Sequence, residues 1–277
     1  MIVLLAGIAA LCYGTSDFIG GLASRRARAL TVLVYSYPAG AVLMTAMLWL
    51  FPGALSWRTV GLGVLGGIAG MVGVALLYRL LAVAPMNVVS PISAVLAAVV
   101  PVIFGVAVGE RPHLAAWVGI LIGLVAVVLV SRTPQDHPHR PVTTAVLLLA
   151  CVAGAGFGFY FICLARADAN SGLWPLVVSR ITSAVVLPAL AAARGALRVP
   201  QRPVLGLALV AGCLDASANL FFLFASRHGY LSLASVITAL YPAATVLLAA
   251  AVLRERTGTL QRAGLALAAT AIVLVTR

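Results

Sequence analysis

The sequence predicts an all-α integral membrane protein with ten transmembrane helices, arranged as two inverted five-helix repeats. Three observations support this prediction. Hydrophobic residues make up 63% of the 277 residues and charged residues only 9%, whereas roughly a quarter of the residues in soluble domains are charged. The apolar residues form ten segments separated by polar or prolyl residues, and polar landmarks recur in both halves of the chain.

The composition excludes a soluble enzyme, a nucleic-acid-binding domain and a disordered protein. With 18 basic and 6 acidic side chains, a soluble protein of this size has too few charges to cover its surface. The net charge of +12 is distributed over short segments between the apolar stretches. It therefore gives no reason to expect nucleic acid as a partner.

Each apolar segment is long enough to cross a bilayer as one helix, which takes about 20 residues. A helix also satisfies its own backbone hydrogen bonds where no water is present. No basic stretch precedes the first segment, which favours a retained helix over a cleaved signal peptide. We expect helices at residues 2–23, 30–51, 59–81, 86–108, 113–131, 142–165, 172–193, 203–226, 230–252 and 258–276.

The longest polar interval lies near the middle of the chain. It reads SRTPQDHPHRP over residues 131–141 and contains three prolines. We therefore expect a first five-helix repeat at 1–131, a linker at 132–141 and a second five-helix repeat at 142–277.

A shift of 145 residues aligns the polar landmarks of the two halves. It places Glu110 on Glu255, Ser90 on Ser235 and Gly119 on Gly264. Because five is an odd number, a five-helix copy must enter the membrane from the opposite side. The sequence thus predicts an inverted repeat, the architecture that many secondary transporters use for alternating access.

Arginine alone provides the basic side chains, since the chain has no lysine. Cytoplasmic loops carry an excess of basic residues, so the more basic side is expected to be cytoplasmic, with both termini outside. Twelve arginines follow the odd-numbered helices: Arg25, Arg26, Arg28, Arg79, Arg132, Arg140, Arg194, Arg198, Arg202, Arg254, Arg256 and Arg262. Five lie on the other side: Arg58, Arg111, Arg166, Arg227 and Arg277.

The repeated segments resemble the drug/metabolite transporter superfamily, and its EamA-type members in particular. The first-half segment is LLYRLLAVAPMNVVSPISAVLAAVVPVIFGVAVGERPHLAAWVGILIGLVAVVLV, and the second is FFLFASRHGYLSLASVITALYPAATVLLAAAVLRERTGTLQRAGLALAATAIVLV. This resemblance covers nearly the whole chain. It implies a ten-helix, inverted-repeat carrier of small organic metabolites or drugs.

The resemblance also implies cytoplasmic termini, opposite to the arginine count, and both orientations stay open at this point. One position departs from the family pattern. Pro242 matches the family's proline before the final loop, whereas the corresponding first-half residue is Ala97.

Two of the six acidic residues, Asp17 and Asp215, lie inside apolar segments. A carboxylate there costs about 2.5–3.5 kcal/mol or more, so it normally faces a cavity or a partner and marks a function. A structural hydrogen bond between helices is the alternative. Glu110 and Glu255 adjoin arginines at expected helix ends, where ion pairing or helix capping is favoured, and Asp136 and Asp168 lie in loops.

Asp17 is the candidate for proton coupling. Helix geometry places it about 22 Å from the start of the first helix, nearer to Arg25 than to the membrane centre. The string DFIGGLASR resembles the first helix of small multidrug-resistance transporters. That resemblance implies a buried carboxylate that alternately binds protons and a cationic substrate.

Arg180 and Asp215 are expected at similar depths, because their helices enter the membrane from opposite sides. Arg180 lies about 12 Å into its helix and also matches an arginine that EamA-type repeats often carry in their second helix. Asn219 follows Asp215 by four residues, which places both on one helical face. The pair can line a central cavity, or it can only fix helix packing. Aromatic candidates for the cavity wall, each with ordinary packing as its alternative, are Tyr13, Tyr160, Trp174 and Tyr241.

We therefore expect a secondary transporter, an exporter of small metabolites or drugs, coupled to protons through Asp17, in which two halves rock about a central cavity. An uncoupled facilitator and an ion- or lipid-translocating protein are the alternatives. The chain has no GxSxG, HExxH, CxxC or nucleotide-binding motif, so we expect no enzyme activity, cofactor or metal. The expected partners are a small-molecule substrate and the lipid bilayer of a bacterial-type plasma membrane. Substrate identity and the choice between monomer and homodimer stay open.

Overall fold

A computed structural model describes residues 1–84, 86–131, 142–254 and 257–276, and every regular element among them is helical. The predicted all-α class is thus confirmed. The first half contains α1 (Ile2–Ser24), α2 (Ala29–Ala46), the short 3-10 helix η1 (Met47–Trp49), α3 (Trp57–Val83), α4 (Met86–Ala107) and α5 (Leu114–Val130). The second half contains α6 (Thr144–Arg166), η2 (Ala169–Ser171), α7 (Trp174–Ala193), α8 (Arg202–Arg227), α9 (Leu231–Thr238), α10 (Tyr241–Val252) and α11 (Thr259–Thr276).

These helices make the chain an integral, multi-pass membrane protein. Within the described ranges, eight helical segments are long and apolar enough to cross a membrane, with α9 and α10 counted together as one of them. The apolar helices α5 and α11 are shorter. The 17 residues of α5 extend over about 26 Å, slightly less than the roughly 30 Å of a typical hydrocarbon core. The count of ten spans stays a prediction.

The prediction of one continuous helix at 230–252 is wrong, because this segment forms two helices, α9 and α10. The chain leaves the α-helical path at Ala239 and Leu240, between α9 and α10. Pro242 explains the break, since it lies in the first turn of α10 and cannot donate a backbone hydrogen bond to the preceding turn. The matching first-half residue is Ala97, and α4 is continuous there. The other helices agree with the sequence to within one or two residues when η1 is counted with α2.

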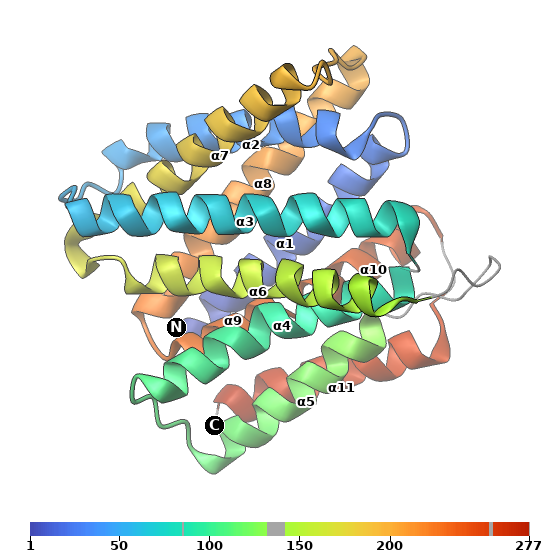
Figure 1. The fold of residues 1–277 in the computed structure, drawn as a ribbon. Coiled ribbons are helices and arrows are strands. Elements are labelled where there is room, and N and C mark those ends of the chain that lie inside the picture. Colours follow the sequence, from blue (N-terminus) through green and yellow to red (C-terminus); the bar gives the residue numbers. More distant parts are fainter. Residues whose placement is uncertain (85, 132–141, 255–256, 277) are drawn as a thin grey trace.

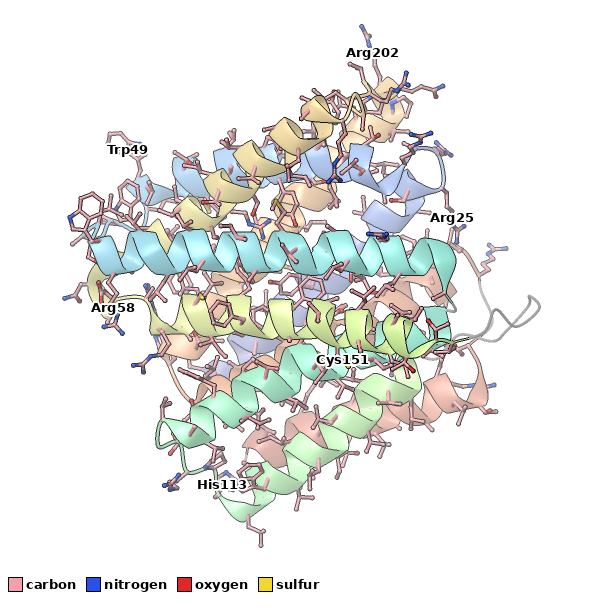
Figure 2. The ribbon with its side chains drawn as sticks, viewed as in Figure 1. Arg25, Trp49, Arg58, His113, Cys151 and Arg202 are labelled. Atoms are coloured by element: carbon pink, nitrogen blue, oxygen red, sulfur yellow. The ribbon has the colours of Figure 1, made fainter. Side chains whose placement is uncertain are left out.

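Successive helices cross the bundle in opposite directions, so the connecting turns gather at two opposite faces (Figure 1). We call one of them the terminal face. It holds Met1, the end of α11 and the turns at 50–56, 108–113, 167–173 and 228–230. The arginine face, opposite, holds the turns at 25–28 and 194–201. Figure 2 shows Arg25 and Arg202 at the arginine face and Trp49, Arg58 and His113 at the terminal face.

The helices of the two halves interlock. The helices α1 and α2 of the first half have their most extensive contacts with α8. In the second half, α6 packs on α3 and α4, and α7 packs on α3 and α2. The helices α5 and α11 pair at one end of the molecule (Figure 1). Close approach depends on glycine at several crossings: a Cβ at Gly119 or Gly264 would meet the partner helix of the α5–α11 pair at 2.7–2.8 Å.

Polar contacts connect three segments at the terminal face. The Asp168 carboxylate accepts hydrogen bonds from Ser56 and, at 3.3 Å, from Thr59, and it lies 3.5 Å from the Arg58 guanidinium. At the end of α8, Arg227 donates to the Gly172 carbonyl at 2.9 Å. These bonds fix the turn between α6 and α7 against the start of α3 and the end of α8.

Candidate functional site

A cavity lies in the middle of the bundle, where α1, α2, α3, α6, α7 and α8 meet. Its volume is about 60 Å³, measured as the space open to the centre of a water molecule. Its wall combines aromatic, hydroxyl and charged groups with two glycines and three apolar side chains. The lining residues are Tyr13, Tyr37, Gly67, Gly70, Met71, Val74, Phe157, Tyr160, Ser179, Arg180, Ser183, Asp215 and Asn219.

An ion pair between α7 and α8 lies in this wall, and the expected proximity of Arg180 and Asp215 is confirmed. The Arg180 Nη2 atom contacts the Asp215 carboxylate and lies 3.4 Å from the Asp215 carbonyl oxygen. The Arg180 side chain is only 6% exposed, whereas that of Asp215 is 34% exposed. The carboxylate therefore stays accessible to a solute while the guanidinium is enclosed.

Arg180 keeps donor capacity beyond this pair. Its Nε atom is buried and has no hydrogen-bond partner among the described residues. The guanidinium carbon lies 5.8 Å from the centre of the Tyr37 ring, within the distance of a cation–π contact. Because an arginine has five N–H donors, the contact with Asp215 does not use all of them, and the buried Nε is one that has no described partner.

A chain of hydrogen bonds connects α1 to the ion pair. The Tyr13 hydroxyl donates to Oδ1 of Asn219 at 2.6 Å, and Nδ2 of Asn219 donates to the Asp215 carbonyl at 2.7 Å. Asn219 is 1% exposed, and both its amide oxygen and its amide nitrogen have a partner in these bonds. The hydrogen bond between Tyr13 and Asn219 thus holds α1 and α8 together at this part of the cavity wall.

Asp17 lies one turn beyond Tyr13 on α1, towards the arginine face, and does not line the cavity. The residue is exposed and has no hydrogen bond or ion pair with a described residue. Its carboxylate interacts electrostatically with that of Asp215.

Two of the aromatic candidates lie outside the cavity wall. Trp174 begins α7 at the terminal face, where its indole N–H donates to the Gly53 carbonyl at 3.1 Å. Tyr241 begins α10, and its ring centre lies 6.1 Å from that of Tyr13. Tyr241 therefore supports a lining residue, while Trp174 has the place of an interfacial anchor.

Apolar residues pack densely on the side of the cavity that faces the terminal face. Next to the lining residue Tyr160, the rings of Phe161 and Phe222 stack with their centres 4.1 Å apart. All eight residues of α9 are buried as well. Packed apolar groups thus lie between the cavity and the terminal face.

Sequence reasoning missed several lining residues. Ser179 and Ser183 flank Arg180 on α7, and their presence in an apolar helix was an available signal. Tyr37 on α2 and Met71 on α3 carried no signal of that kind, since aromatic and apolar residues are common throughout transmembrane helices. Only the packing of the two halves brings them to Arg180.

Comparison with known proteins identifies a matching protein family and a crystal structure of similar fold. Residues 1–132 and 144–277 each match the EamA-like transporter family. A crystal structure with 18% sequence identity matches 99% of this chain and 96% of its own chain with a TM-score of 0.76, and at that identity it shows the fold alone. No curated protein matches the sequence.

Proposed function

The chain belongs to the EamA-like transporter family, and on this premise we propose that it carries a small organic metabolite or drug through the central cavity by alternating access. The family makes it a membrane transporter of the drug/metabolite superfamily. The proposal adds the site, the mechanism and the class of substrate. It places the protein in a bacterial-type plasma membrane.

The observation that carries this proposal is the ion pair in the cavity wall between the enclosed Arg180 and the accessible Asp215. Charged residues inside transmembrane helices are costly and usually mark a substrate or ion pathway. A purely structural pair would be expected to have its donors used by the protein, whereas Nε of Arg180 has no described partner. The cavity also lies between helices of both halves, which is where inverted-repeat transporters bind their substrates.

We propose in addition that the protein is an exporter and that Asp17 couples transport to protons. The support is its position on a cavity helix, where its carboxylate has no ion pair with a described residue and lies within electrostatic range of Asp215. Protonation of Asp17 would change the charge that a solute meets on its way to Arg180. An uncoupled facilitator on the same fold would not need this acid.

Reconstitution into liposomes tests both the proposed solute transport and its proposed coupling to protons. Purified protein is assayed with a panel of small metabolites and cationic drugs, with and without an imposed pH gradient. Accumulation that depends on the gradient is the expected result. Transport that only equilibrates the solute would identify a facilitator, and flux of K⁺ or scrambling of a fluorescent lipid analogue without solute transport would contradict the proposed substrate class.

A further inference from the structure

One acidic side chain of the first half is bonded to a helix start in the second half. Both oxygens of Glu110, in the turn between α4 and α5, accept backbone N–H groups at the start of α9. The Leu231 nitrogen lies 2.6 Å from Oε1 and the Ser232 nitrogen 3.0 Å from Oε2. The first N–H groups of a helix have no partner within the helix, and a negative charge is favourable at this end.

The turn that carries Glu110 is shaped for this contact. Gly109 has a φ of +103°, a conformation that side-chain-bearing residues rarely adopt. The Glu110 nitrogen donates to the Gly105 carbonyl at 2.9 Å, which folds the turn back over the end of α4. A side chain at residue 105 would collide with the Glu110 carboxylate. Two glycines thus make room for one carboxylate to reach the other half of the chain.

The helix that Glu110 caps runs from the terminal face into the interior of the bundle. The residues of α9 are all buried, and α9 packs against α1 and α4. At its far end the chain continues to Tyr241, whose ring packs on the cavity residue Tyr13. For the cavity to open to the terminal face, α9 has to move away from these neighbours.

We propose that Glu110 is a latch that holds α9 in place and thereby keeps the terminal face closed. The latch rests on the proposed alternating-access function, because only a transporter that opens to both sides needs a releasable contact here. When α9 moves, both N–H groups leave the carboxylate and are solvated at the membrane surface. Glu110 is then a positioning residue: it touches no substrate but sets the balance between two states of the protein.

The test measures access to a buried position on α9 from the terminal face. Cys12, Cys151, Cys163 and Cys213 are first replaced, and Thr238→Cys is introduced as the reporter. Thr238 is 0% exposed and its hydroxyl has no hydrogen-bond partner among the described residues, so a thiol loses no bond there. The protein is reconstituted into vesicles, and a membrane-impermeant maleimide is added outside. A separate protein with Leu114→Cys measures the fraction of protein whose terminal face points out of the vesicle. Leu114 is 80% exposed at that face.

Glu110→Gln is expected to accelerate labelling of the reporter from the terminal face by roughly fivefold, the change in population that follows from losing one helix cap. Arg111→Gln is the matched control. Arg111 adjoins Glu110, and its guanidinium donates only to the carbonyls of Val106 and Glu110 among the described residues. It should leave the labelling rate unchanged. Glu110→Asp, which keeps the charge but shortens the reach, should give an intermediate rate.

Equal labelling rates for Glu110→Gln and the parent protein would overturn the latch, as would an equal acceleration by Arg111→Gln. If Glu110→Gln is not recovered as a monodisperse protein, Glu110→Asp decides between the same two outcomes. Because labelling needs no substrate, the result is independent of the transport assay. A protein that transports nothing but shows the expected labelling would contradict the proposed function and leave the Glu110 contact as the determinant of α9 access.

Discussion

Arg180 has unusual surroundings for a residue that only fixes packing. Its guanidinium is enclosed by α2, α7 and α8, with one carboxylate, one aromatic face and one unbonded N–H. Sequence reasoning placed Arg180 near Asp215 because depth in a helix follows from counting residues. The same reasoning did not find the contact of Glu110 with Leu231, because 121 residues separate the two in the chain. Helix periodicity does not predict which turn of the first half meets which helix start of the second half.

Arg180→Ala should abolish transport and leave expression and folding close to normal, if the guanidinium contacts the solute. The cavity side of Asp215 is already 34% exposed, so its charge can be solvated when the partner is removed. Transport into liposomes and size-exclusion profiles measure the two effects.

A packing role for Arg180 makes the opposite prediction. Removing one partner of a buried pair is then strongly destabilising, by about 3–5 kcal/mol. In that case Arg180→Ala would be lost from the membrane fraction, and the double variant with Asp215→Asn would recover folded protein. Recovery by the double variant is the outcome that would contradict the substrate-binding role.

Asp17→Asn should remove transport driven by a pH gradient and leave the fold intact. The physical reason is that Asp17 has no ion pair with a described residue, so its loss breaks no contact, whereas an amide cannot release a proton. Asp17→Glu keeps an ionisable group and should retain part of the activity. Solute accumulation is measured at several imposed gradients. If Asp17→Asn responds to the gradient like the parent protein, coupling lies elsewhere, with Asp215 as the next residue to test.

At the scale of the elements, helix contacts depend on where glycine lies rather than on how many glycines a helix contains. On α8, a Cβ at Gly212 would fall on the backbone of Ser36 in α2, whereas a Cβ at Gly206 would meet no atom within 4 Å. The hydroxyl of Ser36 also donates to the Ala208 carbonyl at 2.8 Å. The α2–α8 crossing is therefore held at backbone-to-backbone distance.

Gly212→Ala should destabilise the protein by about 1–3 kcal/mol, the usual cost of overpacking, while Gly206→Ala should be neutral or slightly stabilising, because alanine is the better helix former. Both variants change the same residue type on the same helix. Their melting temperatures in detergent are compared with that of the parent protein. Equal melting temperatures for the two variants would show that the α2–α8 crossing tolerates a wider spacing.

The break between α9 and α10 shows what the sequence can predict at this scale. The apolar run 230–252 was long enough for one helix, and hydropathy does not report a single non-helical turn inside a span. Pro242, and the absence of proline at Ala97, contained the necessary signal. Proline alone is not sufficient, because α4 continues through Pro91 and Pro101. Only tertiary packing decides which proline ends a helix.

At the scale of the whole molecule, the groups of helices that pack together differ from the two halves of the sequence. The sequence suggests that residues 1–131 and 142–277 rock against each other. In the structure, however, α1 and α2 have their most extensive contacts with α8, and α6 and α7 have theirs with α3, although α6 also packs on α4 and α7 on α2. One bundle, α1, α2 and α8, and another, α3, α6 and α7, therefore each take helices from both halves. The inverted repeat that the sequence predicts would relate these two bundles to each other, and the helices α1 and α6 do run in opposite directions (Figure 1). We expect the two mixed bundles to be the units that move.

A disulfide between α1 and α8 distinguishes these two motions. A Cβ at residue 20 would lie 4.0 Å from that of Ala211, within the Cβ–Cβ range of about 3.5–4.5 Å for disulfides. In a protein without its native cysteines, Gly20→Cys with Ala211→Cys should therefore form a bond on oxidation. If α1 and α8 move as one bundle, the oxidised protein should transport at the rate of the same protein treated with dithiothreitol. Transport that stops on oxidation and returns on reduction would mean that the halves of the sequence separate during each cycle, because the bond joins residue 20 of one half to residue 211 of the other.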